Sequence, residues 1–367
     1  MSLASSCFAP RVAAMAPGPT NNPTPAVRWG RRRLLKFGLG AGAGLLLPAL
    51  LAACRRGEGP VVLAAKGAMP LPWLEALPAG WSQVLLEGSA AVLEALEPAQ
   101  VNRRPGLALA SLPDGWASEL PLERLQPFAE PRLIERLAAA AQPVSRLYRP
   151  EGQPVLAFPW AFSPWVMVFR RQPELAERAR GAEGWAVLAD PALKKQLVLP
   201  SSPRLSIELC SGDLAKLQVL RAQARAFDDV NALNLLLTGE AAAAVVPLQR
   251  LIPLLRRDQR LEVVLPAGGA PLTWQLLLRP AAAKAAPPLE WLGALLEPSL
   301  LVKLLAGGWV PPLPRRELEP ALARLPRTLS RLLLPPDAVL QRCWSLPPLS
   351  PERRLALQIL WDAAAPG

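Results

Sequence analysis

The chain has 367 residues, no histidine, one tyrosine and a formal net charge of +12. Without histidine it can form neither a Ser-His or Cys-His nucleophile pair nor an imidazole metal site. No phosphate-binding P-loop and no dinucleotide-type glycine pattern occurs in the sequence. The composition therefore argues against a hydrolase or a nucleotide-dependent enzyme, and it predicts neither a cofactor nor a metal.

A basic segment and then an apolar one precede the first predicted strand. Arg31-Arg32-Arg33-Leu34-Leu35-Lys36 has the order of a twin-arginine export signal, with Arg31 and Arg32 as the signal pair. The apolar run 37–51 that follows is shorter than the ~20 residues of a spanning helix, which favours a signal-peptide core. An uncleaved N-terminal anchor is the alternative interpretation.

The apolar run ends in a short motif around a cysteine. Leu51-Ala52-Ala53-Cys54 resembles the lipobox of bacterial lipoproteins, in which the cysteine is lipidated and becomes the new N-terminus. We therefore expect 1–53 to be a signal, Cys54 to carry a lipid anchor and 54–60 to be a linker. The expected location is the periplasm, tethered to a membrane through Cys54, and export argues against nucleic acid as a partner.

Short apolar runs alternate with helical patterns along the rest of the chain. Buried strands are expected at 61–65, 83–87, 107–110, 155–158, 166–170, 196–199 and 243–246. Between 155–158 and 166–170 we expect an aromatic loop. Helices are expected at 73–77, 90–96, 132–141, 185–188, 206–225, 228–237, 250–256, 289–296, 299–305 and 355–364. This alternation predicts an α/β fold with mostly parallel strands.

Two cysteines lie beyond the lipobox, Cys210 and Cys343. An oxidising compartment would allow them to form a disulfide. Their distance in sequence does not show that they meet, so a pair of buried free thiols is an equal alternative.

Six short segments occur in a fixed order after residue 158. They are 159–169 (PWAFSPWVMVF), 190–199 (DPALKKQLVL), 235–242 (LLLTGEAA), 265–269 (LPAGG) followed by Trp274, 306–312 (AGGWVPP) and 334–340 (LPPDAVL). In this order they resemble the spermidine/putrescine-binding proteins of bacterial ABC importers, and the similarity covers most of 100–367.

This resemblance implies a fold and a function. The fold is a two-lobed α/β fold of the periplasmic-binding-protein type (type II), with the lobes joined by crossover strands. One lobe would consist of 58–165 plus 271–315 and the other of 166–270 plus 316–367. The implied function is not enzymatic: a lipid-anchored protein would bind a small organic solute of the polyamine class and deliver it to an ABC permease in the membrane.

The resemblance also implies a ligand site between the lobes. Its aromatic members would hold the solute chain and attract ammonium groups, although packing in the core is the alternative for them. The implied ligand-binding residues are Ser111, Phe162, Trp165, Ser202, Trp274, Gln275 and Trp309.

The carboxylates that would pair with the amines are altered. Ser202 and Leu205 stand at acidic positions of the family, and Gln275 stands where the family has aspartate. Glu208, one helical turn beyond Leu205, is expected to supply a displaced carboxylate. Otherwise the solute is an anion or a zwitterion, for which the start of the helix at Ser202, reinforced by Arg204, is suited. An ordinary helix cap is the separate alternative for Ser202. A structural or regulatory lipoprotein that keeps the fold but no longer serves transport is the remaining alternative.

Overall fold

The computed structural model describes residues 59–104, 106–128 and 130–365. The expected signal with Arg31 and Arg32, and the expected lipidation site Cys54, lie outside these residues. Within the described ranges no helix combines the length and the apolar character that a membrane span requires.

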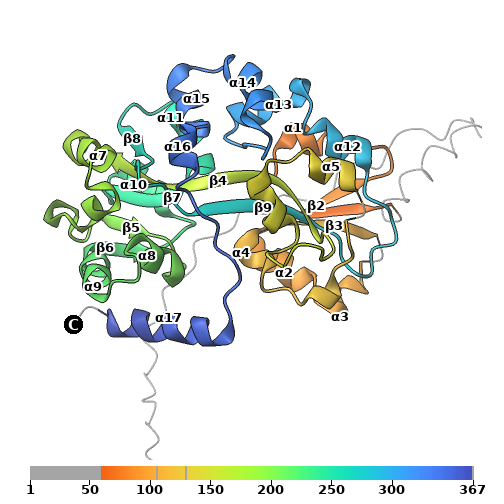
Figure 1. Cartoon of the computed structure of the whole chain (residues 1–367), viewed down its shortest axis with the longest axis horizontal. Coiled ribbons are helices and arrows are strands. Elements are labelled where there is room, and N and C mark those ends of the chain that lie inside the picture. The colour runs from red at the N-terminus through yellow and green to blue at the C-terminus, as the bar shows by residue number, and fades with distance from the viewer. Residues whose placement is uncertain (1–58, 105, 129, 366–367) are drawn as a thin grey trace, which may run out of the picture. The chain divides into compact units, whose positions relative to one another are not determined.

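The fold is built on a mixed sheet with the strand order β2-β1-β3-β9-β4-β7-β5-β6, and β8 pairs with β4 (Figure 1). The strands are β1 (Val61–Ala65), β2 (Ser82–Leu86), β3 (Leu107–Pro113), β4 (Ala157–Arg170), β5 (Leu197–Leu199), β6 (Ala224–Phe227), β7 (Ala243–Pro247), β8 (Leu261–Val264) and β9 (Leu272–Leu278). Parallel pairing joins β2, β1 and β3 at one end, which we call the first strand group, and β7, β5 and β6 at the other, the second strand group. The expected α/β class is confirmed, but between the two groups β9, β4 and β8 pair antiparallel.

Strand β4 connects the two groups, and here the sequence-based expectation was wrong. Instead of two strands and an aromatic loop, 157–170 forms one strand of 14 residues. Its first part pairs with β9 and its last part with β7 and β8. The two prolines that suggested a loop are tolerated because Pro159 lies at a break in the register and Pro164 at the last pair with β9.

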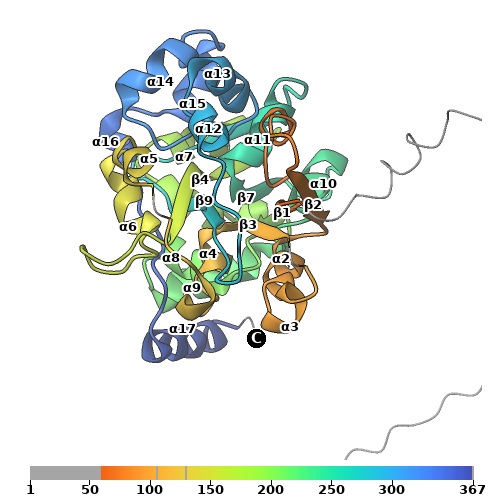
Figure 2. The ribbon, with the colours of Figure 1, turned by 90° about the vertical axis from the view of Figure 1, so that its right-hand side faces the viewer.

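Helices cover both faces of the sheet. They are α1 (Leu71–Leu74), α2 (Ser89–Ala95), α3 (Pro98–Val101), α4 (Asp114–Ala117), α5 (Pro131–Glu135), α6 (Gln142–Ser145), α7 (Pro173–Arg180), α8 (Pro203–Leu209), α9 (Leu214–Gln223), α10 (Ala232–Thr238), α11 (Leu248–Leu255), α12 (Leu289–Ala294), α13 (Pro298–Ala306), α14 (Arg315–Leu322), α15 (Arg327–Leu333), α16 (Asp337–Leu340) and α17 (Pro351–Ala363). Helices α13–α15 lie on one side of the sheet and α17 on the other (Figures 1 and 2).

The single helix expected over 206–225 is wrong as well. Ser211 and Gly212 adopt left-handed backbone angles and end α8, after which Asp213 begins α9 by accepting a hydrogen bond from Lys216 N. The end of the expected helix is strand β6. A glycine that ends one helix, followed directly by a capping aspartate, is the signal that the apolar pattern concealed.

Over 165–169 the side chains of β4 alternate between two hydrophobic clusters, as the two faces of a strand require. Val166 and Val168 belong to the larger cluster, whereas Met167 and Phe169 pack under the helices of the second strand group. Strand β4 therefore fixes the two strand groups to each other through both faces.

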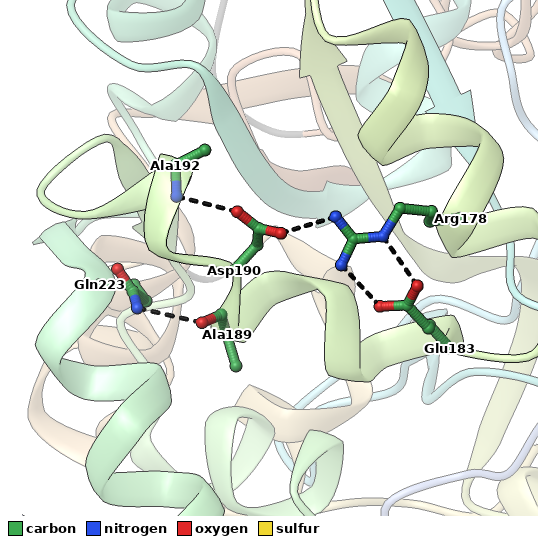
Figure 3. A network of polar contacts seen from close by, with 6 residues as sticks. All are labelled: Arg178, Glu183, Ala189, Asp190, Ala192 and Gln223. Carbon is green, nitrogen blue, oxygen red and sulfur yellow. Dashed lines mark hydrogen bonds and ion pairs between the residues drawn. The ribbon is translucent and has the colours of Figure 1, made fainter.

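An ion-pair network ties α7 to the short 3₁₀ turn that follows it (Figure 3). The Arg178 guanidinium donates to both carboxylate oxygens of Glu183, at 2.7 and 2.8 Å, and to Asp190 Oδ2 at 2.6 Å. Asp190 also accepts from Ala192 N at 2.8 Å. This network lies on the surface and holds the loop that precedes β5.

Strands β4 and β9 join the two strand groups, and we call the place where they do so the crossover. The chain after α16 returns past this crossover before it forms α17. We call this segment, 341–350, the C-terminal strap. Trp344 forms a parallel bridge with Pro271, because Leu272 N donates to Trp344 O at 2.7 Å and Trp344 N donates to Ala270 O at 3.0 Å. The strap thereby places α17 against α8 and α9.

Candidate ligand-binding site

A cavity of about 610 Å³ lies where the two strand groups meet. Residues at or just beyond the carboxyl ends of β3, β5, β6 and β7 line it, together with side chains of β4 and β9. Carboxyl ends of parallel strands are the usual ligand-binding edge of α/β sheets. Here the ends from both groups face one space. The lining residues used below are Asp114, Trp116, Glu119, Phe162, Trp165, Ser201, Ser202, Arg204, Asp229, Arg250, Gln275 and Trp309.

Three of the aromatic residues expected at the site line this cavity: Phe162, Trp165 and Trp309. Trp274 does not; it is buried behind Phe162, with ring centroids 5.4 Å apart, and its Nε1 donates to Ser345 Oγ at 2.9 Å. Trp274 therefore supports a lining ring and connects it to the C-terminal strap. The neighbouring Trp160 is a core residue, packed against Trp73 and Trp309.

The expected polar residues divide in the same way. Ser202 and Gln275 line the cavity, and the Gln275 Oε1 atom is buried without a hydrogen-bond partner among the described residues. Ser111 is buried within β3 and Glu208 points elsewhere, so neither lines the cavity. The Glu208 carboxylate lies 4.0 Å from Arg204 Nε.

Sequence reasoning missed a buried carboxylate that lines the cavity. Asp114, the first residue of α4, is only 5% exposed. Its Oδ1 accepts from Trp274 N at 3.1 Å and from Thr273 Oγ1 at 3.4 Å, and its Oδ2 accepts from the Tyr148 hydroxyl at 3.2 Å. Burial raises the pKa of Asp114 to about 6, although the hydrogen bonds from Trp274 and Tyr148 oppose that rise.

The signal for Asp114 was present but ambiguous. Pro113-Asp114-Gly115 follows a buried strand and has the composition of an ordinary turn. Nothing local distinguishes a turn aspartate from a ligand-facing one. What distinguishes Asp114 from a turn aspartate is its contact with Thr273 and Trp274 of β9, which lie 159 and 160 positions later in the chain.

Two arginines of the second strand group also line the cavity, and burial lowers the pKa of each. Arg204 on α8 donates from one terminal nitrogen to Pro347 O at 2.7 Å, while its Nε is buried and has no hydrogen-bond partner in the described part of the chain. Arg250 on α11 donates to the backbone carbonyls of Asp229 and Val230. The Asp229 carboxylate in turn accepts from Ser201 Oγ at 2.5 Å. The cavity wall thus carries charges of both signs.

No set of three or more His, Cys, Asp and Glu side chains in the described part of the chain could hold a metal ion. Cys210 and Cys343 are free thiols, the first buried and the second partly buried. Burial raises the pKa of Cys210 to about 11, so its thiol is protonated at neutral pH.

Neither a protein-family model nor a curated protein matches the sequence. Solved structures do match the fold. A spermidine/putrescine ABC transporter substrate-binding protein from Streptococcus pneumoniae is 12% identical, with a TM-score of 0.65 over 84% of this chain and 98% of that one. A periplasmic binding protein (PBP) from A. tumefaciens B6 in complex with glucopine is 11% identical, with a TM-score of 0.60 over 84% of this chain and 100% of that one.

A third neighbour is a PBP from A. tumefaciens R10 in complex with agropinic acid, 14% identical with a TM-score of 0.57 over 83% of this chain and 98% of that one. These neighbours are described as binding or transport proteins rather than as enzymes. At such low identity the likeness concerns the fold alone. The chain therefore has the two-lobed α/β fold of ABC transporter substrate-binding proteins, as the sequence led us to expect.

Proposed function

We propose that this protein is the solute-binding component of an ABC importer and captures a small organic solute in the cavity between its strand groups. One observation carries the proposal: side chains from both groups, aromatic and charged, line a single cavity together with side chains of the paired strands β4 and β9. Cavities of 300–1,000 Å³ with mostly apolar walls and a few polar groups are typical of small-molecule sites. Capture and release would follow from hinged movement of the two lobes.

The proposal includes a location and a partner. Cys54 would carry the lipid that tethers the protein on the periplasmic side of a membrane, after export through the twin-arginine signal. The lobes would be 58–165 plus 271–315 and 166–270 plus 316–367. An ABC permease in the membrane would receive the solute, and no chemical conversion would take place.

Two classes of solute are candidates. The family resemblance favours a polyamine such as spermidine or putrescine, whose methylene chain would lie against Phe162, Trp165 and Trp309. The alternative is an anion or a zwitterion. The position of Glu208 bears on this choice, because its carboxylate faces Arg204 rather than the cavity and so is not placed to receive an amine.

A thermal-shift screen of the full chain with polyamines, amino acids and small organic anions tests the function. A solute that binds only the native state at 100 times its Kd should stabilise that state by about 2.7 kcal/mol. Trp116→Ala should weaken the response, because Trp116 lines the cavity and is 41% exposed, so its loss leaves the fold intact. The matched control is Phe227→Ala, an exposed aromatic residue that contacts Trp361 instead of the cavity.

A cavity that accepts no solute in this screen would contradict the proposal. It would favour a structural or regulatory lipoprotein with the same fold, for which the altered acidic positions at Ser202, Leu205 and Gln275 are the motivation. The absence of genes for a permease and an ATPase beside this one would point in the same direction.

A further inference from the structure

We infer that the solute is a zwitterion, with its ammonium group at Asp114 and its anionic group at Arg204. This inference rests on the proposed function, because it assigns the chemical class of the solute that the same cavity binds. It concerns two residues from different strand groups, one on α4 and the other on α8.

Asp114 has no positively charged partner among the residues that the structure describes. The groups that donate to its carboxylate are a backbone amide and two hydroxyls, all neutral. Among the described residues no cation lies within 4.0 Å of it, although the side chain is almost completely buried. A buried carboxylate with only neutral partners is poorly compensated, as its raised pKa shows. An ammonium group arriving from the cavity would supply the missing charge.

Arg204 has the opposite deficiency. One terminal nitrogen donates to the backbone of the C-terminal strap, and the carboxylate of Glu208 is 4.0 Å from the Nε. The described residues provide no hydrogen-bond partner for that Nε. Burial outweighs the attraction of Glu208 and lowers the arginine pKa. A carboxylate of the solute would pair with the Arg204 guanidinium and accept hydrogen bonds from it, because the guanidinium presents donors suited to a planar anion.

The two charges attract each other but do not meet. The negative charge of Asp114 favours the charged form of Arg204, yet the two side chains form no ion pair within 4.0 Å. Both line one cavity. An anion and a cation held apart across a cavity are complementary to a solute that carries both charges, and the aromatic walls would cover the carbon chain between them.

The charges also discriminate against other solutes. A diamine would place its second ammonium group near Arg204 and Arg250, and a dicarboxylate would place its second carboxylate near Asp114 and Asp229. Like charges in a partly desolvated site reduce affinity, and such repulsion is a common source of specificity. A zwitterion avoids both conflicts.

Three solutes with the same four-carbon chain test this inference: 4-aminobutyrate, putrescine and succinate. A second series has six carbons: 6-aminohexanoate, 1,6-diaminohexane and adipate. Calorimetric titration of the full chain at pH 7.5 should show each amino acid binding at least tenfold more tightly than the diamine and the diacid of its length. Asp114→Asn and Arg204→Gln should each weaken amino-acid binding at least tenfold. The matched control, Asp337→Asn, changes an exposed ion pair with Arg315 outside the cavity and should leave binding unchanged.

The outcomes separate the two proposals. Tightest binding of a diamine or a diacid, or amino-acid binding that survives both cavity variants, would overturn the zwitterion inference while the protein remains a solute receptor. Binding of none of the six compounds, together with no response in the thermal-shift screen, would overturn both.

Discussion

Asp114 connects the stability of the protein to its ligand chemistry. Its pKa in the native state is about 6, compared with an ordinary value of 3.8, and the cause is burial. Between these two values the native state binds more protons than the unfolded state. The free energy of unfolding of the ligand-free protein therefore decreases as the pH rises from about 4 to about 6, and above about pH 7 the cost of the charge is fully present.

Replacing Asp114 by asparagine should remove this cost. A difference of about two pKa units corresponds to about 3 kcal/mol, so Asp114→Asn should raise the free energy of unfolding at pH 7.5 by up to that amount. The asparagine amide can still accept from Trp274 N and can donate to the Tyr148 hydroxyl. Denaturant unfolding at pH 4 and pH 7.5 provides the measurement. Lower stability of the variant at pH 7.5 would mean that the hydrogen bonds to the carboxylate are worth more than its burial costs.

Acidification should weaken solute binding through the same residue. The titratable and charged groups around Asp114 are Tyr148 and Arg204, with Glu119 also in the cavity wall. Tyr148 stays protonated, because burial and the neighbouring Asp114 raise its pKa, and Arg204 stays charged. Affinity for an ammonium-bearing solute should therefore fall at least threefold between pH 7.5 and pH 5.5. Titrations at both values give the comparison, and an equal fall in Asp114→Asn would assign the effect to another group.

At the scale of the residue, sequence reasoning recovered the aromatic part of the cavity better than the charged part. Phe162, Trp165 and Trp309 stand in local motifs that can be recognised by order alone. Asp114 gains its character from Tyr148, Thr273 and Trp274, which come from other parts of the chain. Charge compensation is a property of the folded environment, so the lack of a cation near Asp114 has no counterpart in the local sequence.

Among the elements, β4 and the C-terminal strap show how tertiary context overrides local signals. The prolines of β4 predict a loop, but pairing with β9 and the bridge between Phe162 and Val310 hold this part of the strand extended. The strap has no regular structure of its own. It is held at the crossover by Trp344 and by the bond between Ser345 and Trp274. Strands β1, β3, β5 and β7 are predictable because their apolar runs are local, whereas β6, at one end of the sheet, lies where the apolar pattern predicted the end of a helix.

The contact between the strap and the crossover makes Gly269 difficult to replace. Gly269 has a φ of +87°, and a Cβ atom there would lie 2.1 Å from the carbonyl oxygen of Arg342. Gly67 has a similar φ of +71° but open space around it, so Gly67→Ala is a matched control that adds backbone strain alone, worth roughly 1 kcal/mol. Gly269→Ala should cost at least twice as much, because backbone atoms must move. Denaturant unfolding of both variants measures the difference. Equal losses in the free energy of unfolding would show that the strap moves away from residue 269 at no measurable cost.

Over the whole molecule, the fold was predictable because the order of its elements is encoded along the chain. The sequence left the chemical class of the solute open between a polyamine, an anion and a zwitterion, because Asp114 gains its surroundings only where distant parts of the chain meet. The cellular location, like the fold, can be predicted from the order of residues along the chain. The export signal and the lipobox are linear motifs, so they support predictions that do not depend on the folded structure.

The export route is the first of these predictions. Replacing Arg31, Arg32 and Arg33 together by lysine keeps the positive charge but removes the arginine pair that the twin-arginine machinery reads. Precursor should then accumulate in the cytoplasm. Fractionation with an antibody against the folded domain gives the result, and normal processing of the triple variant would indicate the general secretory route.

The lipid anchor at Cys54 is the second prediction that rests on a linear motif. Cys54→Ala removes the thiol that would carry the lipid, and with it the acyl chains that would hold the protein at a membrane. The variant should therefore appear as a released or unprocessed form with a changed mass. Cys343→Ala is the matched control, because Cys343 is a partly buried free thiol in the C-terminal strap and its loss should leave processing unchanged. A Cys54→Ala protein that sediments with membranes at the mass of the wild type would show that something other than this cysteine holds the protein there.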